Sequence, residues 1–193
     1  MLKKIIKRYV FGCLATTYFQ PLFKGLHSLA LWGMNIGLGS DVDNSGERYV
    51  LRRFAKTISL DYSSVVFDIG ANRGEWALTA LEVLGQRSKI YCFEPQVAAF
   101  KLLSGRLQGH PKVSVYNFGL GEYEGCATLY MDKEGSGCAS LYNRKGLVMA
   151  KAEQVKILTL DGFCADKGIN RIDYLKLDVE GHELAVLRGG VVC

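Results

Sequence analysis

The sequence predicts an α/β fold with a mostly parallel sheet, and three observations support this prediction. From Ser64 onward, short apolar runs alternate with segments whose apolar residues recur at helical spacing. The runs are rich in β-branched and aromatic residues, as buried strands are. A glycine turn follows the first run and leads into a helical pattern. The chain of 193 residues is long enough for one domain with a sizeable core, and too short for two.

Each element follows from the local pattern of apolar residues. Strands are expected at 65–69, 89–93, 113–117, 126–131, 155–158 and 172–177. Helices are expected where apolar residues recur every three or four positions, at 74–84, 96–108, 160–166 and about 182–188. Gly85 is expected to end the first of these helices. The alternating strand 126–131 and a short partner at 139–142 predict a β-hairpin inserted between the parallel units.

An N-terminal helical extension, residues 1–45, precedes the main domain, residues 46–193, in this prediction. Apolar residues at helical spacing predict two helices in it, about 2–19 and 22–35. The formal net charge is +5, and the body of the chain is neutral. The whole excess comes from the first 40 residues, which hold no acid and five bases: Lys3, Lys4, Lys7, Arg8 and Lys24. Because a nucleic-acid-binding domain would spread a basic face over its fold, we expect no nucleic-acid partner.

Three interpretations of the basic N-terminal segment stay open. In the first interpretation the segment packs on the main domain. In the second it makes a peripheral contact with an anionic membrane surface through residues 1–33, and in the third it is a secretory signal. Gln20 and Pro21 interrupt the stretch, which argues against a membrane-spanning helix of about 20 apolar residues. The six cysteines form no CxxC pair and no zinc-type cluster, so we expect no metal and a reducing compartment. The expected location is cytoplasmic, either free or peripheral at the inner membrane surface.

A glycine turn joins the first expected strand of the main domain to the following helix, in the segment 65–74. Glycines allow positive φ and close backbone approach, and the start of the helix offers free N–H groups. Such a turn binds the polar part of a nucleotide-like ligand. Two cofactor classes compete for it, a nicotinamide dinucleotide and S-adenosylmethionine.

Side chains in and after this turn favour S-adenosylmethionine. Asn72 stands where dinucleotide sites have the glycine that lies against the pyrophosphate. The Asp68 carboxylate would repel pyrophosphate, but it can accept hydrogen bonds from the ammonium of a bound amino acid. Glu94 ends the second strand, where a carboxylate can bind ribose hydroxyls. Both cofactors carry a ribose, so Glu94 does not discriminate between them.

Several blocks of residues, in this order, resemble the FkbM-type methyltransferases, a branch of the S-adenosylmethionine-dependent class with a Rossmann-like, doubly wound sheet. The resemblance covers about residues 34–190, and its last long block is the most specific. The blocks are Met34–Gly37 with Ser45–Glu47, Phe67–Gly74, Phe93–Pro95, Leu158–Asp161, and Asp173–Glu183 with Leu187–Gly189.

The resemblance implies a site and an activity. Family members generally methylate hydroxyl groups of small molecules, sugars or glycolipids. Asp178 would face the transferred methyl group and the acceptor, Glu94 would bind the ribose, and Asn117 would lie near the adenine. The methionine end of the cofactor would be lined by four residues of the glycine turn: Asp68, Gly70, Asn72 and Gly74.

The segment after the last expected strand is rich in groups for proton transfer, because Asp178, Glu180, His182 and Glu183 fall within six residues. A hydroxyl acceptor gains from proton removal as the new bond forms. His182 is either that base, with an unperturbed pKa of about 6.5, or the start of the next helix facing solvent. Glu183 is expected to stabilise the N-terminus of that helix. The carboxylates also suggest Mg²⁺, but the acid and amide set of metal-dependent catechol-type enzymes is not traceable here.

The resemblance implies seven strands, of which four can be counted before the chain stops at Cys193. The chain is therefore expected either to be truncated at its C-terminus or to have its sheet completed by another chain in an oligomer. The first alternative to an enzyme is an inactive remnant or a cofactor-binding interaction module. A further alternative is an NAD(P)-binding oxidoreductase, against which Asn72 and the block 173–183 argue.

Overall fold

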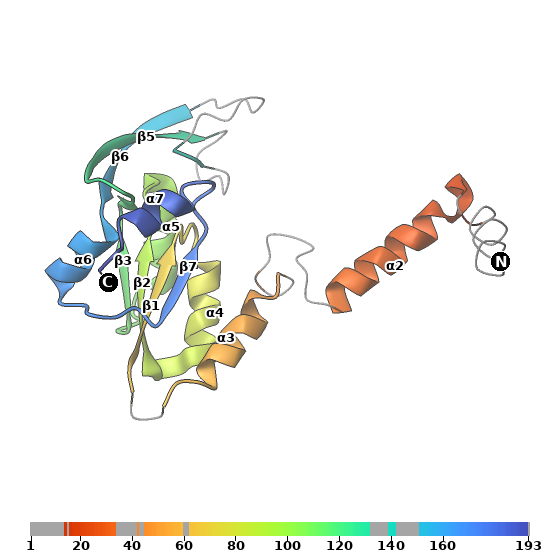
Figure 1. The fold of residues 1–193 in the computed structure, drawn as a ribbon, viewed down its shortest axis with the longest axis horizontal. Helices are drawn as coiled ribbons and strands as arrows, with labels where there is room; N and C mark the ends of the chain where they lie inside the picture. Colours follow the sequence, from red (N-terminus) through yellow and green to blue (C-terminus); the bar gives the residue numbers. More distant parts are fainter. Residues whose placement is uncertain are drawn as a thin grey trace. The chain divides into compact units, whose positions relative to one another are not determined.

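The computed structural model describes Leu14, Val42 and residues 16–33, 45–59, 62–131, 139–141 and 151–192. The chain divides into two compact units, residues 1–50 and residues 51–193 (Figure 1).

The described part of the first unit is mainly helical. A short 3-10 helix, Thr17–Phe19, leads into α2, Gln20–Gly33, and the first turn of α3, Glu47–Ala55, follows. The second expected helix is therefore confirmed to within two residues, whereas most of the first, about 2–19, lies outside the described residues. Pro21 fits in the first turn of α2, where its missing N–H has no intrahelical partner. No helix in the described parts of the chain is long and apolar enough to cross a membrane.

A four-stranded parallel sheet, sheet A, forms the centre of the second unit. Its strand order is β3-β2-β1-β7, and β1 pairs with β2 and β7 in parallel. The expected strands and crossover helices are confirmed to within two residues at each end, apart from those of sheet B below. The strands are β1 Ser64–Ile69, β2 Ser88–Phe93, β3 Val113–Tyr116 and β7 Tyr174–Leu177, and the helices are α4 Glu75–Leu84, α5 Val97–Leu107, α6 Leu160–Lys167 and α7 Glu183–Arg188.

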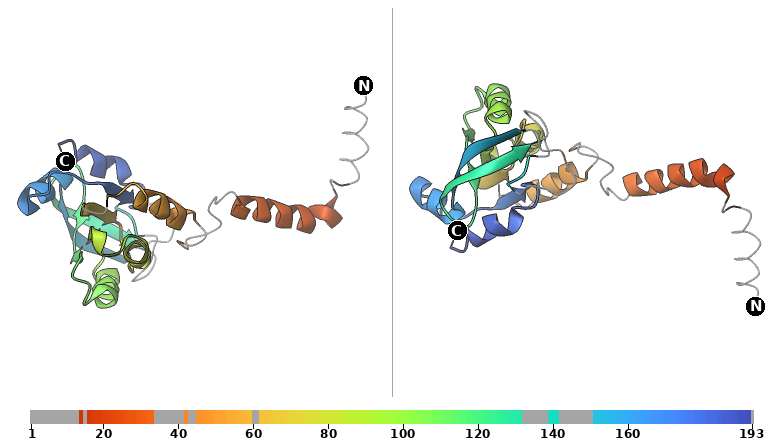
Figure 2. Two further views of the ribbon diagram at one scale, coloured as in Figure 1. Left: turned by 90° about the horizontal axis from the view of Figure 1, so that it is seen from below. Right: turned by 90° about the horizontal axis from the view of Figure 1, so that it is seen from above.

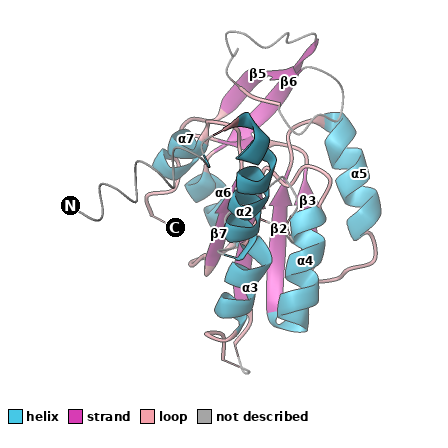
Figure 3. Cartoon of the chain, turned by 90° about the vertical axis from the view of Figure 1, so that its right-hand side faces the viewer, coloured by secondary structure: helices cyan, strands magenta, loops and turns pink. Residues whose placement is uncertain are grey.

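Helices cover both faces of sheet A, as a doubly wound fold requires. Figure 3 shows α3 and α4 on one face, where Leu51 is buried and the Trp76 ring lies 5.6 Å from Tyr174. Helix α6 covers the other face, where Phe163 meets Phe93 edge to face with ring centroids 4.8 Å apart. An edge-to-face aromatic pair of this kind adds to the stabilisation from burial alone. The mixed α/β, mostly parallel architecture expected from the sequence is confirmed.

A second, smaller sheet, sheet B, contains the expected strand 126–131 and gives it a longer partner than the predicted hairpin does. Strand β5, Gly125–Met131, pairs along its length with β6, Lys151–Leu158, in antiparallel register, and β4, Gly119–Leu120, adds to the other edge of β6. Residues 139–141 are the described part of the predicted partner segment 139–142, and within them Ser140 forms an antiparallel bridge with Tyr130. Alternating apolar residues are compatible with any antiparallel partner. The sequence pattern therefore did not predict that β6, a longer and more distant strand, is the main partner of β5.

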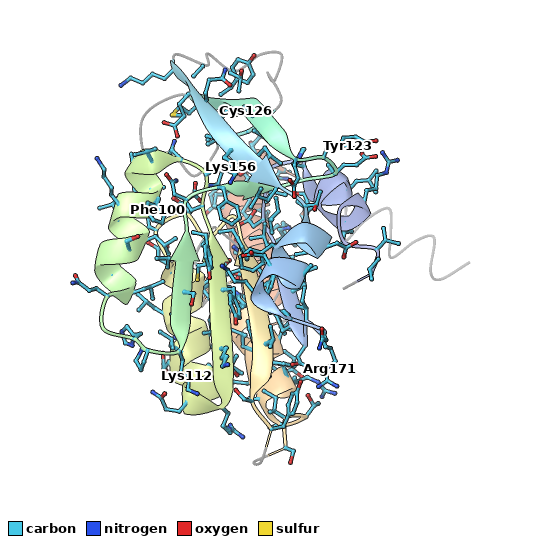
Figure 4. All side chains as sticks on the ribbon, turned by 90° about the vertical axis from the view of Figure 1, so that its left-hand side faces the viewer. Phe100, Lys112, Tyr123, Cys126, Lys156 and Arg171 are labelled. Atoms are coloured by element: carbon cyan, nitrogen blue, oxygen red, sulfur yellow. The ribbon has the colours of Figure 1, made fainter. Side chains whose placement is uncertain are left out.

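Sheet B lies over the carboxyl ends of the sheet A strands. In Figure 4, Cys126 and Lys156 mark sheet B at one end of sheet A, and Lys112 and Arg171, which precede β3 and β7, lie at the other. The view from above in Figure 2 shows β5 and β6 crossing this end. Sheet B has its own small core of four buried residues: Leu129, Met131, Val155 and Ile157.

Candidate functional site

A cavity lies between the carboxyl ends of β1, β2 and β7 and the inner side of sheet B. It encloses about 660 Å³ of empty space, open solvent at its mouth included, and this is the end at which open α/β sheets bind ligands. One side, called the polar wall, consists of Gly70, Asn72, Glu94, Asp178, Glu180 and His182. The facing side, called the apolar wall, consists of Leu120, Leu129, Ala139 and Leu141.

The turn after β1 requires glycine at position 70. Gly70 has a φ of +80°, and a Cβ there would overlap the backbone carbonyl of Asp178. The turn is fixed further because the N–H groups of Gly70 and Ala71 both donate to the Phe93 carbonyl, at 3.0 Å each. Gly74, with a φ of +82°, precedes α4 as its N-cap. Because a side chain is excluded at Gly70, the turn after β1 can pack directly against the backbone of Asp178.

Asn72 supplies an unsatisfied acceptor to the polar wall. Its φ is +46°, a left-handed conformation that asparagine adopts more readily than most residues. Its side-chain Oδ1 is buried and has no hydrogen-bond partner among the described residues. Since buried polar atoms are nearly always paired, this oxygen fits a hydrogen-bond donor of a bound ligand.

Glu94 is buried where β2 ends. Its carboxylate accepts the backbone N–H of Asn72 at 2.8 Å and that of Gln96 at 2.9 Å. Burial raises the pKa of Glu94 to about 7, although these two N–H groups oppose the shift. Near neutral pH the group therefore exchanges readily between the acid and the carboxylate.

Asn117 and Gly74 support the site from outside the cavity wall. The Asn117 amide donates to the carbonyls of Glu94, at 2.9 Å, and Pro95, at 3.0 Å, and so holds the chain after β2 against the end of β3. A Cβ on Gly74 would lie 2.8 Å from Leu103, so Gly74 lets α4 approach α5 closely. The cofactor contacts expected of these two residues stay predictions.

Asp68 lies away from the cavity wall. Its side chain is fully buried and forms an ion pair with Lys176, whose Nζ lies 3.1 Å from Asp68 Oδ1. The same ammonium donates to the Gly70 carbonyl at 3.3 Å and lies 3.6 Å from Asp178 Oδ2. The expected contact between Asp68 and a cofactor ammonium stays a prediction. Lys176 was not predicted as a site residue, although a lysine between apolar residues of a core strand was a usable signal.

The loop after β7 carries the three residues expected to act on the acceptor. Asp178 is mostly exposed, and its N–H donates to the Ile69 carbonyl at 3.0 Å. Glu180 has a φ of +53°, and its carbonyl accepts the Ser140 hydroxyl at 3.0 Å. That bond ties the polar wall to the segment that carries the apolar wall, and no sequence pattern marked Ser140.

His182 is half-buried, and burial lowers its pKa while the charge of Glu183 opposes the shift. Its imidazole fits beside Gly121, where a Cβ would lie 3.0 Å from Nε2. A lowered pKa keeps the ring neutral near pH 7, the form that can accept a proton. Glu183 accepts the Gly181 N–H at 3.1 Å, and its pKa is lowered by backbone N–H groups, first its own, as expected for an acid that stabilises a helix start.

The structure brings six of the nine predicted site residues together on the polar wall and leaves Asp68, Gly74 and Asn117 behind it. The motif Leu158–Asp161 also gains a structural explanation. The Asp161 carboxylate accepts the N–H groups of Val191 and Val192, and so fixes the chain after α7. Among the described residues, no cluster of His, Cys, Asp or Glu side chains could hold a metal ion.

Residues 68–192, more than half of the chain, match the family model described as the Methyltransferase FkbM domain. The chain belongs to the FkbM methyltransferase family. The match begins at Asp68 and includes the whole polar wall, so the residues that line the cavity belong to the family domain.

Two curated proteins are similar to this FkbM domain protein. The 2-O-methyltransferase NoeI of Sinorhizobium fredii is 24% identical over 140 residues, which cover 65% of this chain and 57% of NoeI. The AMB antimetabolite synthetase AmbE of Pseudomonas aeruginosa is 26% identical over 167 residues, which cover 68% of this chain and 8% of AmbE. The chain thus spans only part of the length of each relative. No solved structure matches it significantly.

Proposed function

We propose that this protein is an S-adenosylmethionine-dependent methyltransferase that methylates a hydroxyl group on a small molecule, a sugar or a glycolipid. Membership of the FkbM methyltransferase family and similarity to a 2-O-methyltransferase support the transfer of a methyl group to oxygen. The observation that carries the proposal is that Gly70, Asn72 and Glu94 line one cavity at the carboxyl end of sheet A. There Asn72 and Glu94 offer different hydrogen-bond acceptors to a nucleoside-like ligand.

These three residues fit the chemistry of S-adenosylmethionine. The orphaned Oδ1 of Asn72 can accept from the cofactor's ammonium, and Gly70 fixes the turn before it by packing against the Asp178 carbonyl. Glu94, in its carboxylate form, can accept from ribose hydroxyls. A dinucleotide is disfavoured because Asn72 stands where dinucleotide sites have the glycine that lies against the pyrophosphate. When bound, the cofactor supplies a methyl group activated by a sulfonium.

The loop after β7 is assigned to the acceptor. His182 is held neutral by burial and can take the proton of an acceptor hydroxyl. Asp178 and Glu180 lie on the same wall, where their carboxylates can orient the acceptor by accepting its other hydroxyl protons. The facing apolar wall can exclude water and shape the remainder of the acceptor.

Transfer of a labelled methyl group tests this proposal. Purified protein is mixed with S-adenosylmethionine labelled at the methyl group and with separate sugar, small-molecule and glycolipid fractions of a cell extract. The expected result is alkali-stable label in one fraction, which His182→Ala reduces by about a hundredfold because general base catalysis is worth that much. The matched control His110→Ala, outside the cavity, keeps the label. Binding of the cofactor without transfer into any fraction would instead favour the cofactor-binding module.

A second proposal concerns the location of the protein. We propose that the N-terminal extension makes a peripheral contact with an anionic membrane from the cytoplasmic side. Leu22, Leu26 and Leu29 of α2 are each more than half exposed, in a segment without acidic residues. Apolar side chains and bases together favour an anionic lipid surface. Sedimentation with phosphatidylglycerol vesicles should fall when Leu26 and Leu29 are both changed to Glu, and equal sedimentation of both proteins would contradict the contact.

A further inference from the structure

The ammonium of Lys176 lies near the ends of β1 and β7, where the backbone segments that follow these strands touch at Gly70 and Asp178. Asp68 and Lys176 are register neighbours on β1 and β7, so their side chains extend from adjacent strands on the same face of sheet A. Three oxygens surround the ammonium: Asp68 Oδ1 at 3.1 Å, the Gly70 carbonyl at 3.3 Å and Asp178 Oδ2 at 3.6 Å. The ammonium donates a hydrogen bond to the Gly70 carbonyl and forms ion pairs with the two carboxylates.

Two of these three oxygens belong to residues of the cavity wall. Gly70 and Asp178 line the cavity, whereas Asp68 is fully buried and does not. The side chain of Asp178 is 66% exposed, so without a nearby cation it could adopt several rotamers. Lys176, only 13% exposed, therefore restricts both the glycine turn and the carboxylate beside it.

A contribution to stability is not enough to explain why Asp68 and Lys176 form a buried ion pair. Well-packed apolar residues in place of a buried ion pair are often as stable or more stable, because two charges must be desolvated to form the pair. The pair here does what an apolar pair cannot do, since its ammonium also reaches the Gly70 carbonyl and the Asp178 carboxylate.

We propose that Lys176 is a positioning residue of the cofactor site, and that Asp68 acts through Lys176 without touching the bound cofactor. Asp68 neutralises the ammonium and holds it at the carboxyl ends of the neighbouring strands β1 and β7. Lys176 in turn fixes the Gly70 carbonyl and Asp178 at the spacing that the cofactor and the acceptor require. This assignment rests on the proposed function.

A double-mutant cycle on the pair tests the assignment. Lys176→Met, Asp68→Asn and the double variant are titrated with S-adenosylhomocysteine, and their thermal unfolding is recorded. Lys176→Met alone leaves Asp68 buried without its cation, so that single variant should be the least stable. The double variant has similar volumes and no buried charge, and it keeps the experiment interpretable where the single variant fails to fold.

The expected result is that the folded double variant binds S-adenosylhomocysteine about tenfold more weakly than the wild type, because small misplacements of contact groups have effects of at least this size. Asp68→Asn should add nothing to the loss caused by Lys176→Met. The matched control Lys167→Met, which removes the same charge from an exposed ion pair with Asp166, should bind like the wild type.

Other outcomes would overturn the assignment. Wild-type affinity in the folded double variant would mean that the pair is structural only. An equal loss from Asp68→Asn in both backgrounds would mean that Asp68 contacts the ligand directly. If folded wild-type protein binds no S-adenosylhomocysteine, both the proposed function and this assignment are wrong. If the wild type binds and the folded double variant binds equally well, only the assignment is wrong.

Discussion

The polar and apolar walls face the same cavity but are built differently. Residues of the polar wall follow β1, β2 and β7 directly, so the ends of parallel strands and the left-handed turn at Gly70 fix their backbone. The apolar wall comes from sheet B and its neighbours, and its Leu129 is held by packing within the separate core of that sheet. The comparison teaches that the backbone of sheet A sets the chemistry of the site, whereas side-chain packing in sheet B sets its shape.

Gly70→Ala should lower the free energy of unfolding by the largest amount, because it disrupts the backbone of the polar wall. The new Cβ would overlap the Asp178 carbonyl, and alanine is strained at a φ of +80°. We expect a loss of about 4 kcal/mol in the free energy of unfolding, or no folded protein, because the overlapping atom is backbone. Urea denaturation measures it.

Gly105→Ala is the matched control for that change. Nothing lies within 4 Å of a Cβ at Gly105, and this position is inside α5. Alanine there should raise the free energy of unfolding by about 1 kcal/mol, as helix propensity predicts. Equal effects of the two substitutions would contradict the close approach of Gly70 to the Asp178 backbone.

The pH dependence of stability tests Glu94 next. Its pKa is about 7 in the folded protein against an ordinary 4.5, so the folded state retains a proton that the unfolded state loses between these values. Stability from this group is therefore fully present below about pH 4.5 and is lost as the pH rises to about 7, by about 3 kcal/mol in all. Urea denaturation at pH 5 and pH 8 should show most of this loss in the wild type and little of it in Glu94→Gln. Parallel pH profiles for the two proteins would show that Glu94 does not titrate in this range.

Leu129→Ala should affect the apolar wall alone. Leu129 is 3% exposed within the core of sheet B, and its truncation should lower the free energy of unfolding by about 2 to 3 kcal/mol. Binding of S-adenosylhomocysteine should stay within about threefold, because the proposed contacts lie on the polar wall and sites without shared partners behave independently. Leu102→Ala, on an exposed site of α5, is the control for stability. A loss of affinity like that from a change on the polar wall would remove the distinction between the walls.

Thr159→Ala should have the smallest effect, since it touches neither wall. The Thr159 hydroxyl accepts the Gly162 N–H at 3.1 Å and caps α6. Loss of such a cap costs about 1 kcal/mol, and Thr159→Ser should restore it. Thermal unfolding measures both, and S-adenosylhomocysteine binding should not change. An unchanged melting temperature would mean that the cap contributes nothing.

The sequence was sufficient for sheet A because its strands are short runs of mainly apolar residues, and helices follow three of them, β1, β2 and β7. Parallel strands place their carboxyl ends at one edge, so Gly70, Glu94 and Asp178 could be expected together from their positions alone. Sheet B was less predictable, because the partner of β5 is separated from it along the chain and alternation does not specify which strand pairs with which.

Some features of the site could likewise be predicted from the sequence, and others became visible only in the fold. Asp68 could be placed at the end of a strand, but a strand pattern does not say that a lysine from a neighbouring strand neutralises it. Lys176 could have been noticed as a charge within a core strand, and the register that pairs it with Asp68 came only from the fold. Ser140 carries no signal, since its role depends on one hydrogen bond to the backbone of Glu180.

Calorimetric titration with S-adenosylhomocysteine tests the central claim, that the polar wall binds this class of cofactor, most directly. The wild type should bind one equivalent, and Glu94→Ala should bind about tenfold more weakly because it removes hydrogen bonds to a charged group. Leu129→Ala, on the opposite wall, should bind like the wild type. Absence of binding by well-folded wild-type protein, or wild-type affinity in Glu94→Ala, would contradict the account.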